Sequence, residues 1–137
     1  MELPDWPDGT VAVLTTGGPE PHAIPVSLVL RAGPRALLIG LAERRRSLER
    51  LRADGRCAVT ILAAGDHAFT AYGRAVGFEA AGALVAARID VDELADHNRP
   101  TYQIIGGVQW HWTDERDRAR DAESRAALRQ LLSRRRS

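Results

Sequence analysis

Short apolar runs separated by turn residues recur along most of the chain. The runs are rich in β-branched and aliphatic residues, and glycine or proline often stands between them. This pattern predicts short strands, the first three of which are joined by tight hairpins. The expected strands cover residues 10–16, 22–30, 35–41, 56–62, 68–76, 85–91 and 107–112.

The hydrophobic period changes to a helical one in two places. Within residues 45–54, Leu48 and Leu51 are three positions apart among charged residues, and Gly55 follows where a helix would end. From Arg116 onward, apolar residues recur among charges and predict a terminal amphipathic helix. We also expect a helical turn over residues 92–98, which Pro100 would end.

Several expected strands are apolar on both of their alternating faces. A half-exposed open sheet would alternate apolar and polar residues more cleanly. Strands buried on both sides fit a barrel whose outer wall also packs against something, and a second subunit is the expected cover. The pattern therefore predicts a mainly β barrel that assembles as a homodimer.

Composition narrows the class of protein. A chain of 137 residues fits one domain, expected here over residues 1–137. No apolar stretch approaches the roughly 20 residues that span a membrane, and a net charge of +1 argues against nucleic acid as a partner. The start of the chain lacks a secretory pattern and Cys57 is the only cysteine, so we expect a cytoplasmic protein without disulfides.

Arginine supplies all 19 basic residues, and three of them precede Ser47 where a strand gives way to the expected helix. A helix N-terminus presents unpaired amides and positive potential, so arginines are unfavourable there unless an anion is bound. A phosphate would resolve this conflict. In a chain this rich in arginine, three consecutive arginines also arise by chance, as at residues 134–136. We therefore predict a phosphate site at Arg44, Arg45 and Arg46 because they stand at the start of a helix, not because there are three of them.

The order of three segments strengthens this prediction. Residues 21–30 read PHAIPVSLVL, residues 36–41 read ALLIGL, and residues 45–59 read RRSLERLRADGRCAV. In this order they resemble the flavin-binding split barrels related to pyridoxamine phosphate oxidase. In that family a Pro-x-x-x-Pro-Val strand precedes a hairpin, a Ser-Arg-Lys-like phosphate clamp and a helix. The resemblance covers about residues 10–76.

The resemblance implies a Greek-key-like split β-barrel of about six to seven strands, with a short helix after the third strand and a C-terminal helix. It also implies a bound FMN. Arg45, Arg46 and Ser47 take the places of the clamp's serine, arginine and lysine, while Ala68 takes the place of a glutamine that oxidases use. The implied cofactor-binding residues are Pro25, Val26, Ser27, Leu28, Gly40, Leu41, Arg45, Arg46 and Ser47, and Trp110 could stack on a flavin held by the partner subunit.

A protein of this kind would move a hydride between its flavin and an unidentified small molecule at the dimer interface. Its cofactor does the chemistry, so no catalytic side chain is expected, and the scattered histidines suggest no metal site. It would not be a true pyridoxamine phosphate oxidase, because no Arg-x-His-like substrate region follows Gly107.

Three alternatives stay open. The chain could be a reductase that uses 8-hydroxy-5-deazaflavin, whose anionic tail Arg31, Arg35 and Arg44 could contact, although these residues could equally be solvated. It could instead be a non-catalytic protein that binds or stores flavin or haem. Separately, Trp110 and Trp112 could fill a dimer core in place of contacting a flavin.

Overall fold

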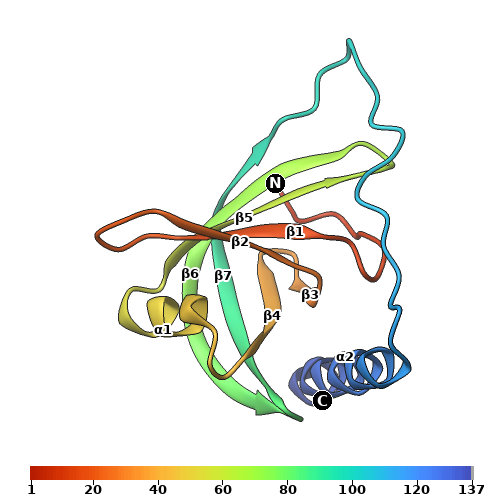
Figure 1. Cartoon of the computed structure of the whole chain (residues 1–137). Helices are drawn as coiled ribbons and strands as arrows, with labels where there is room; N and C mark the ends of the chain where they lie inside the picture. Colours follow the sequence, from red (N-terminus) through yellow and green to blue (C-terminus); the bar gives the residue numbers. More distant parts are fainter. Residues whose placement is uncertain (137) are drawn as a thin grey trace.

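The structure is a computed structural model that describes residues 1–136. Seven strands and two helices make up its regular elements (Figure 1). No helix among these residues is long and apolar enough to cross a bilayer. The elements are β1 (Ala12–Thr16), β2 (His22–Val26), β3 (Val29–Gly33), β4 (Ala36–Ala42), α1 (Arg46–Ala53), β5 (Arg56–Ala63), β6 (His67–Ala81), β7 (Leu84–Asp96) and α2 (Glu115–Arg136).

The strands form one antiparallel sheet in the order β2-β1-β5-β6-β7-β4-β3. The edge strands β2 and β3 are nevertheless consecutive in the chain, with only Ser27 and Leu28 between them. So short a link reaches about 10 Å at most, and the sheet must therefore curl until its two edges approach. At this seam the Gly40 amide donates a 2.9 Å hydrogen bond to the Leu28 carbonyl. The predicted barrel is confirmed.

The long strands β6 and β7 bend from one half of the barrel into the other (Figure 1). Their pairing shifts register at Tyr72/Gly73 and again at Ala75/Gly77. At the first shift, a Cβ on Gly73 would lie 2.1 Å from the carbonyl oxygen of Asp90. Only glycine lets the two backbones come this close, so Gly73 permits the bend.

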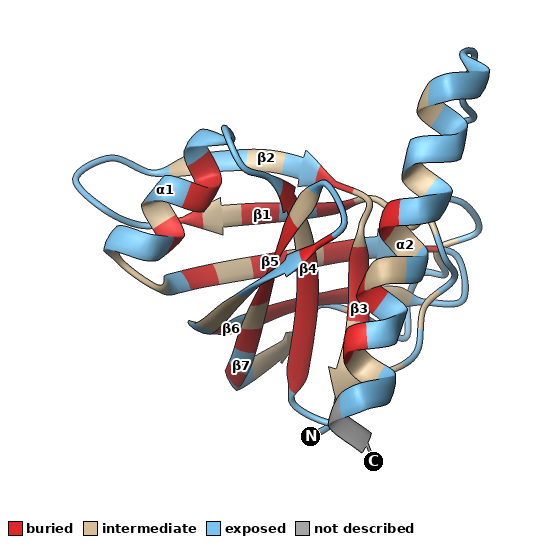
Figure 2. Cartoon of the chain, turned by 90° about the horizontal axis from the view of Figure 1, so that it is seen from below, coloured by how far each residue is buried: buried red, intermediate tan, exposed pale blue. Residues whose placement is uncertain are grey.

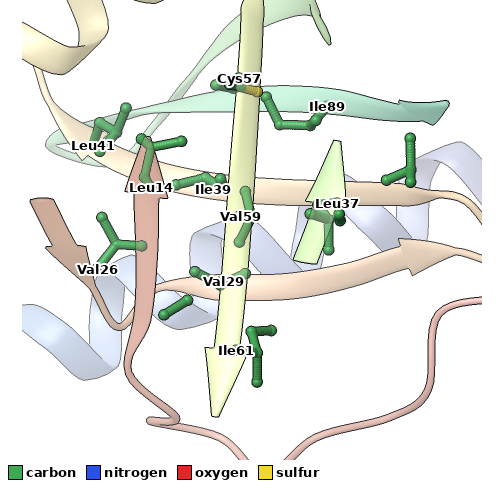
Figure 3. Packing of buried hydrophobic residues seen from close by; sticks show 14 of the residues in the cluster. Leu14, Val26, Val29, Leu37, Ile39, Leu41, Cys57, Val59, Ile61 and Ile89 are labelled. Atoms are coloured by element: carbon green, nitrogen blue, oxygen red, sulfur yellow. The ribbon is translucent and has the colours of Figure 1, made fainter. Parts of the chain in front are cut away.

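The inward side chains of the strands make one apolar core (Figure 3). Along each strand every second residue points inward, and inward residues of paired strands face the same space, as Leu14 and Val59 do. The core also fixes the seam where the two sheet edges meet, because Val26 and Val29, on either side of the two-residue link, are both buried in it. Its fully buried members include Leu14, Leu37, Ile39, Leu48, Val59, Ile61 and Ile89.

Helix α2 covers the outer face of β4. Leu38, which points away from the main core, packs with Leu128 and Leu131 in a second apolar cluster. Figure 2 shows the buried residues of α2 on the side that faces β3 and β4. The apolar outer face of β4 is thus covered by the chain's own helix, and for this part of the wall the expected cover by a second subunit is wrong.

Three predicted elements are wrong. The expected strand over residues 22–30 breaks into β2 and β3 at the seam, so α1 follows the fourth strand and not the third. Residues 92–98 form no helical turn, because β7 continues to Asp96, which pairs with Phe69. Long-range pairing here overrides the local preference. Residues 107–112 form no strand, and the chain between β7 and α2 has no helix or strand.

Replacing Gly73 with alanine tests the bend. The added methyl has no room beside the Asp90 carbonyl, so Gly73→Ala should lower the free energy of unfolding by about 1–3 kcal/mol or more. Gly77→Ala is the matched control, since nothing lies within 4 Å of a Cβ there, and should change stability by less than about 0.5 kcal/mol. Urea unfolding of both variants checks this, and equal losses would contradict it.

Candidate functional site

A cleft of about 430 Å³ lies where β2 ends. This volume falls within the range of sites that hold small molecules and cofactors. Four of the residues expected to bind a cofactor meet here, with the β2 segment on one side and the segment that enters α2 on the other. The lining residues are Val11, Pro25, Val26, Ser27, Trp110, His111, Trp112, Thr113, Asp114 and Asp117.

The end of β2 offers an uncharged surface to this cleft. Pro25 points outward and is exposed, and it fits an edge strand because it has no amide to donate to a neighbour. Val26 points into the core, and Ser27 begins the link to β3. This segment can therefore lie against a flat ligand without a competing strand on its free side.

Two tryptophans form the opposite side of the cleft. The rings of Trp110 and Trp112 meet edge to face with their centroids 5.2 Å apart, and Trp110 Nε1 donates a 2.9 Å hydrogen bond to the Gly9 carbonyl. Because residues 107–112 are not a strand, Trp110, His111 and Trp112 do not alternate between two faces, and all three line the cleft. Both indoles keep about 40% of their surface exposed, as a binding surface requires.

The start of α2 gives one end of the cleft a negative charge. Asp114 accepts hydrogen bonds at Oδ1 from the amides of Arg116 and Asp117, at 2.8 and 3.2 Å, and so caps the helix. Asp117 lies in the first turn, where an acidic side chain interacts favourably with the helix dipole. With no arginine in its lining, this cleft suits an uncharged ring better than a phosphate.

The N-terminus of α1 has the opposite charge. Arg44, Arg45 and Arg46 are exposed, and within residues 1–136 none of them takes part in an ion pair. Arg45 is the N-cap residue and its side chain makes no capping hydrogen bond. The first amides of the helix therefore lack a side-chain acceptor beside uncompensated positive charge.

Ser47 adds an unsatisfied hydroxyl at the same place. Its side chain is 1% exposed and its Oγ has no hydrogen-bond partner. A buried polar group in this state costs about 1–3 kcal/mol. An anion bound at this helix end would satisfy the amides and the arginines together, and Ser47 Oγ could join them only by turning outward, because it has no accessible surface in this structure. The residues present thus fit a phosphate group.

The other expected cofactor-binding residues lie apart from the cleft. Leu41 is buried in the main core, and Leu28 packs in the cluster beneath α2. A Cβ on Gly40 would lie 3.0 Å from Leu128 and 3.3 Å from Leu28, so α2 covers this glycine on its outer side. Leu41 and Gly40 could therefore approach a ligand at the seam only through their backbone, whereas Leu28 is partly exposed.

Two arginines that could have served a deazaflavin tail hold the N-terminal segment and β7 in place. Arg31 Nε donates to the Leu3 carbonyl at 3.0 Å. Arg35 donates from Nε to the Val91 carbonyl at 3.2 Å and from Nη1 to the Met1 carbonyl at 2.9 Å. Of the three arginines considered for the tail, these two already have backbone partners.

Two polar features near these surfaces have no clear signature in the sequence. Arg125 of α2 lies behind Ser27, where its Nη2 donates a long 3.4 Å hydrogen bond to the Ser27 carbonyl. On the outer face of the sheet, Thr70 Oγ1 lies 2.9 Å from Thr60 Oγ1 and 2.8 Å from His97 Nε2. The one hint of Arg125 in the sequence is its place at the margin of the apolar stripe of α2, three positions before Leu128.

No protein-family model matches this chain, and no curated protein matches it in sequence. Solved structures are similar in fold. The NADH:FAD oxidoreductase SgcE6 of Streptomyces globisporus is 18% identical with a TM-score of 0.56, covering 67% of this chain and 72% of that chain. BorF, the flavin reductase component of a bacterial two-component tryptophan halogenase, is 15% identical with a TM-score of 0.57. The match covers 66% of this chain and 81% of BorF.

A pyridoxamine 5'-phosphate oxidase-like protein of Listeria innocua is similar to the same extent, at 18% identity and a TM-score of 0.55, covering 66% of this chain and 90% of that chain. The fold is therefore the split barrel of flavin reductases and pyridoxamine 5'-phosphate oxidase-like proteins, as the sequence resemblance predicted. At these identities the likeness concerns the fold.

Cys57 lies in the core and is not suited to nucleophilic chemistry. Burial, with a smaller contribution from Asp92, raises the pKa of its thiol to about 12, so the thiol stays protonated at neutral pH. Among residues 1–136, no three His, Cys, Asp or Glu side chains gather as a metal site would require.

We expect Cys57 to resist thiol reagents in the folded protein. At pH 8 the folded chain should react with a disulfide reagent at least about a hundredfold more slowly than the chain unfolded in urea, because both burial and the raised pKa oppose thiolate formation. The time course of reagent release measures this. Equal rates in the two states would contradict the placement of Cys57 in the core.

Proposed function

We propose that this chain binds FMN and acts as an oxidoreductase on a small molecule, as a cytoplasmic homodimer. The observation that carries the proposal is the pairing of two complementary surfaces. One is the aromatic cleft beside Pro25, Val26 and Ser27, and the other is the basic, unsatisfied N-terminus of α1. FMN has an uncharged ring at one end and a phosphate at the other, so each surface suits one end of the cofactor.

In this proposal the ring lies against the segment from Pro25 to Ser27, with Trp110 on its other side. The phosphate takes hydrogen bonds from the first amides of α1 and, once its side chain turns outward, from Ser47, and charge from Arg45 and Arg46. The backbone near Gly40 and Leu28 contacts the ribityl chain of FMN, which links the ring to the phosphate. Ser47 replaces a lysine of the family's clamp, and neighbouring Arg45 supplies the missing charge.

A bound flavin would supply hydride chemistry, and the protein's own residues would bind, orient and exclude water. The tryptophans and the β2 segment form an apolar surface over which a small substrate can lie. The related structures include an NADH:FAD oxidoreductase and a flavin reductase, which supports an oxidoreductase more than a storage protein. The hydrogen bonds of Arg31 and Arg35 favour FMN over a deazaflavin with an anionic tail.

Part of the outer face of β2, β1, β5 and β6 supports the homodimer. Eight of its outward residues form two rows across the paired strands without a charge among them, and the next outward pair along β5 and β6 is Arg56 and Arg74. One row holds Pro25, Val13, Thr60 and Thr70, and the other holds Ala23, Thr15, Ala58 and Tyr72. We call these eight residues the uncharged face. Val13 and Tyr72 on it are more than 40% exposed.

A solvated sheet face normally carries polar and charged residues, and charges also protect it from pairing with other molecules. An exposed face without charges indicates an interface. Pro25 belongs both to this face and to the cleft, so a second copy seated here would also close the candidate site. A second copy of this chain is the occupant we propose.

Two substitutions test the dimer. In light scattering after size exclusion, the natural chain should have the mass of a dimer, and Ala58→Glu should have the mass of a monomer, because it buries a charge in the uncharged face. Ala126→Glu, on the exposed side of α2, should remain dimeric. A natural chain that is monomeric at micromolar concentration would overturn this part of the proposal.

FMN titration tests the phosphate site. The natural chain should quench FMN fluorescence, and Ser47→Ala should weaken binding about tenfold through loss of one hydrogen bond to a charged group. Without ligand, the same variant should be as stable as the natural chain or more so, because the hydroxyl is unsatisfied there. Riboflavin, which lacks the phosphate, is the control and should bind both proteins equally. A natural chain that binds no flavin would sink the proposal.

A further inference from the structure

Exposed hydrophobic side chains gather on one part of the surface. Among residues 1–136, ten large hydrophobic side chains are exposed, and eight of them lie on the uncharged face, at its end on β5, or between β7 and α2. Single exposed residues of this kind need no explanation, whereas a gathering of them marks a contact surface. The eight are Val13, Leu62, Tyr72, Tyr102, Ile105, Val108, Trp110 and Trp112.

Residues 100–112 supply most of this surface. We call them the connecting segment, because they lie in the chain between β7 and α2 (Figure 1). The segment contains no acidic residue and no arginine, and Ile105 and Val108 are 92% and 68% exposed. Solvated segments between regular elements are normally polar, so this composition indicates that the segment is covered in the assembled protein.

The middle of the connecting segment has an unpaired backbone. The Ile104 amide donates to Asp66 Oδ1 at 2.8 Å, which holds the segment on one side. The bond from the Trp110 indole to the Gly9 carbonyl holds it on the other. Between these points, residues 105–109 make no hydrogen bond within the part of the chain that the structure describes. A held segment with apolar side chains and free amides and carbonyls is suited to contact with another chain.

The connecting segment continues the uncharged face. In one direction along β5 and β6, the face ends at Arg56 and Arg74. In the other direction, the next outward pair is Leu62 and Ala68, which carry no charge. The segment crosses β5 there, because a Cβ on Gly107 would lie 3.1 Å from the Leu62 carbonyl oxygen. A partner seated on the uncharged face therefore lies beside the segment as well.

The size and charge of the combined surface favour a second copy as the partner. The eight residues of the uncharged face are too few, because a stable interface takes about 20 to 30 residues from each side. The thirteen residues of the connecting segment bring the total to the lower end of this range. Neither part carries a carboxylate or a guanidinium, so two copies can meet symmetrically without burying an unpaired ion.

We propose that the connecting segment is a second part of the homodimer interface, buried against a second copy of this chain, where residues 105–109 find hydrogen-bond partners. This inference rests on the homodimer of the proposed function and not on its cofactor. Trp110 and Trp112 belong to the segment and line the cleft, so assembly also fixes one wall of the cleft.

Charges placed on the segment test the proposal. In sedimentation of a dilution series, Ile105→Glu and Val108→Glu should each raise the dimer dissociation constant at least about a hundredfold, because each buries an unpaired carboxylate. Both side chains are exposed in the single chain, so both variants should fold, as circular dichroism checks. Val76→Glu is the matched control. Val76 is exposed beyond the bend of β6, and this variant should stay within about twofold of the natural chain.

Hydrogen exchange of the natural chain tests the proposal without a substitution. Without a partner, the amides of residues 105–109 have no acceptor in the protein and should exchange close to the rates of an unfolded peptide. In the dimer they should exchange at least about tenfold more slowly. Exchange at unfolded rates, at a concentration where the chain is dimeric, would contradict the proposal.

The outcomes separate this inference from the homodimer itself. A natural chain that is monomeric at micromolar concentration overturns both. If the natural chain is a dimer that Ala58→Glu dissociates, but folded Ile105→Glu and Val108→Glu assemble as the natural chain does, this inference alone is wrong. Equal weakening by Val76→Glu and Ile105→Glu also contradicts it, because the effect would then not depend on where the charge is placed.

Discussion

The two-residue link between β2 and β3 is the constraint on which the rest of the structure depends. Ser27 and Leu28 join strands that lie at opposite edges of one sheet, so the sheet has to close. Closure puts the end of β2 beside β4, where α2 can cover the seam through Leu128. The candidate cleft opens at this seam because Ser27 leaves the strand there. The binding surface is thus a consequence of how the barrel closes.

Charge is divided between the two ends of the proposed site. Acidic residues that stabilise the start of α2 make the cleft unsuited to a phosphate, whereas uncompensated arginines and uncapped amides make the start of α1 suited to one. Both helix N-termini are the positive end of a helix dipole, but only that of α2 is capped by a side chain, that of Asp114. This difference, and not the number of arginines, distinguishes the anion site.

The hydrophobic pattern of the sequence predicts the barrel, α1 and α2, whereas the choice of Pro25 to Ser27 as a binding segment came from the family resemblance. The pattern fails where distant residues decide the outcome. Residues 92–98 have a helical composition but pair with β6, and residues 107–112 alternate like a strand yet make no sheet pairing. Nothing local shows that residues 22–30 must break, since both halves are apolar. The contact of Arg125 with Ser27 joins residues far apart in the chain, so no local pattern indicates it.

The central claim is that the cleft at β2 and the N-terminus of α1 are the two ends of one flavin site. A crystal structure of the protein grown with FMN tests it most directly. The claim predicts the ring against Pro25 and Ser27 with Trp110 nearby, and the phosphate on the first amides of α1 beside Ser47. Ordered FMN whose phosphate lies elsewhere, with Ser47 still unpartnered, would contradict it.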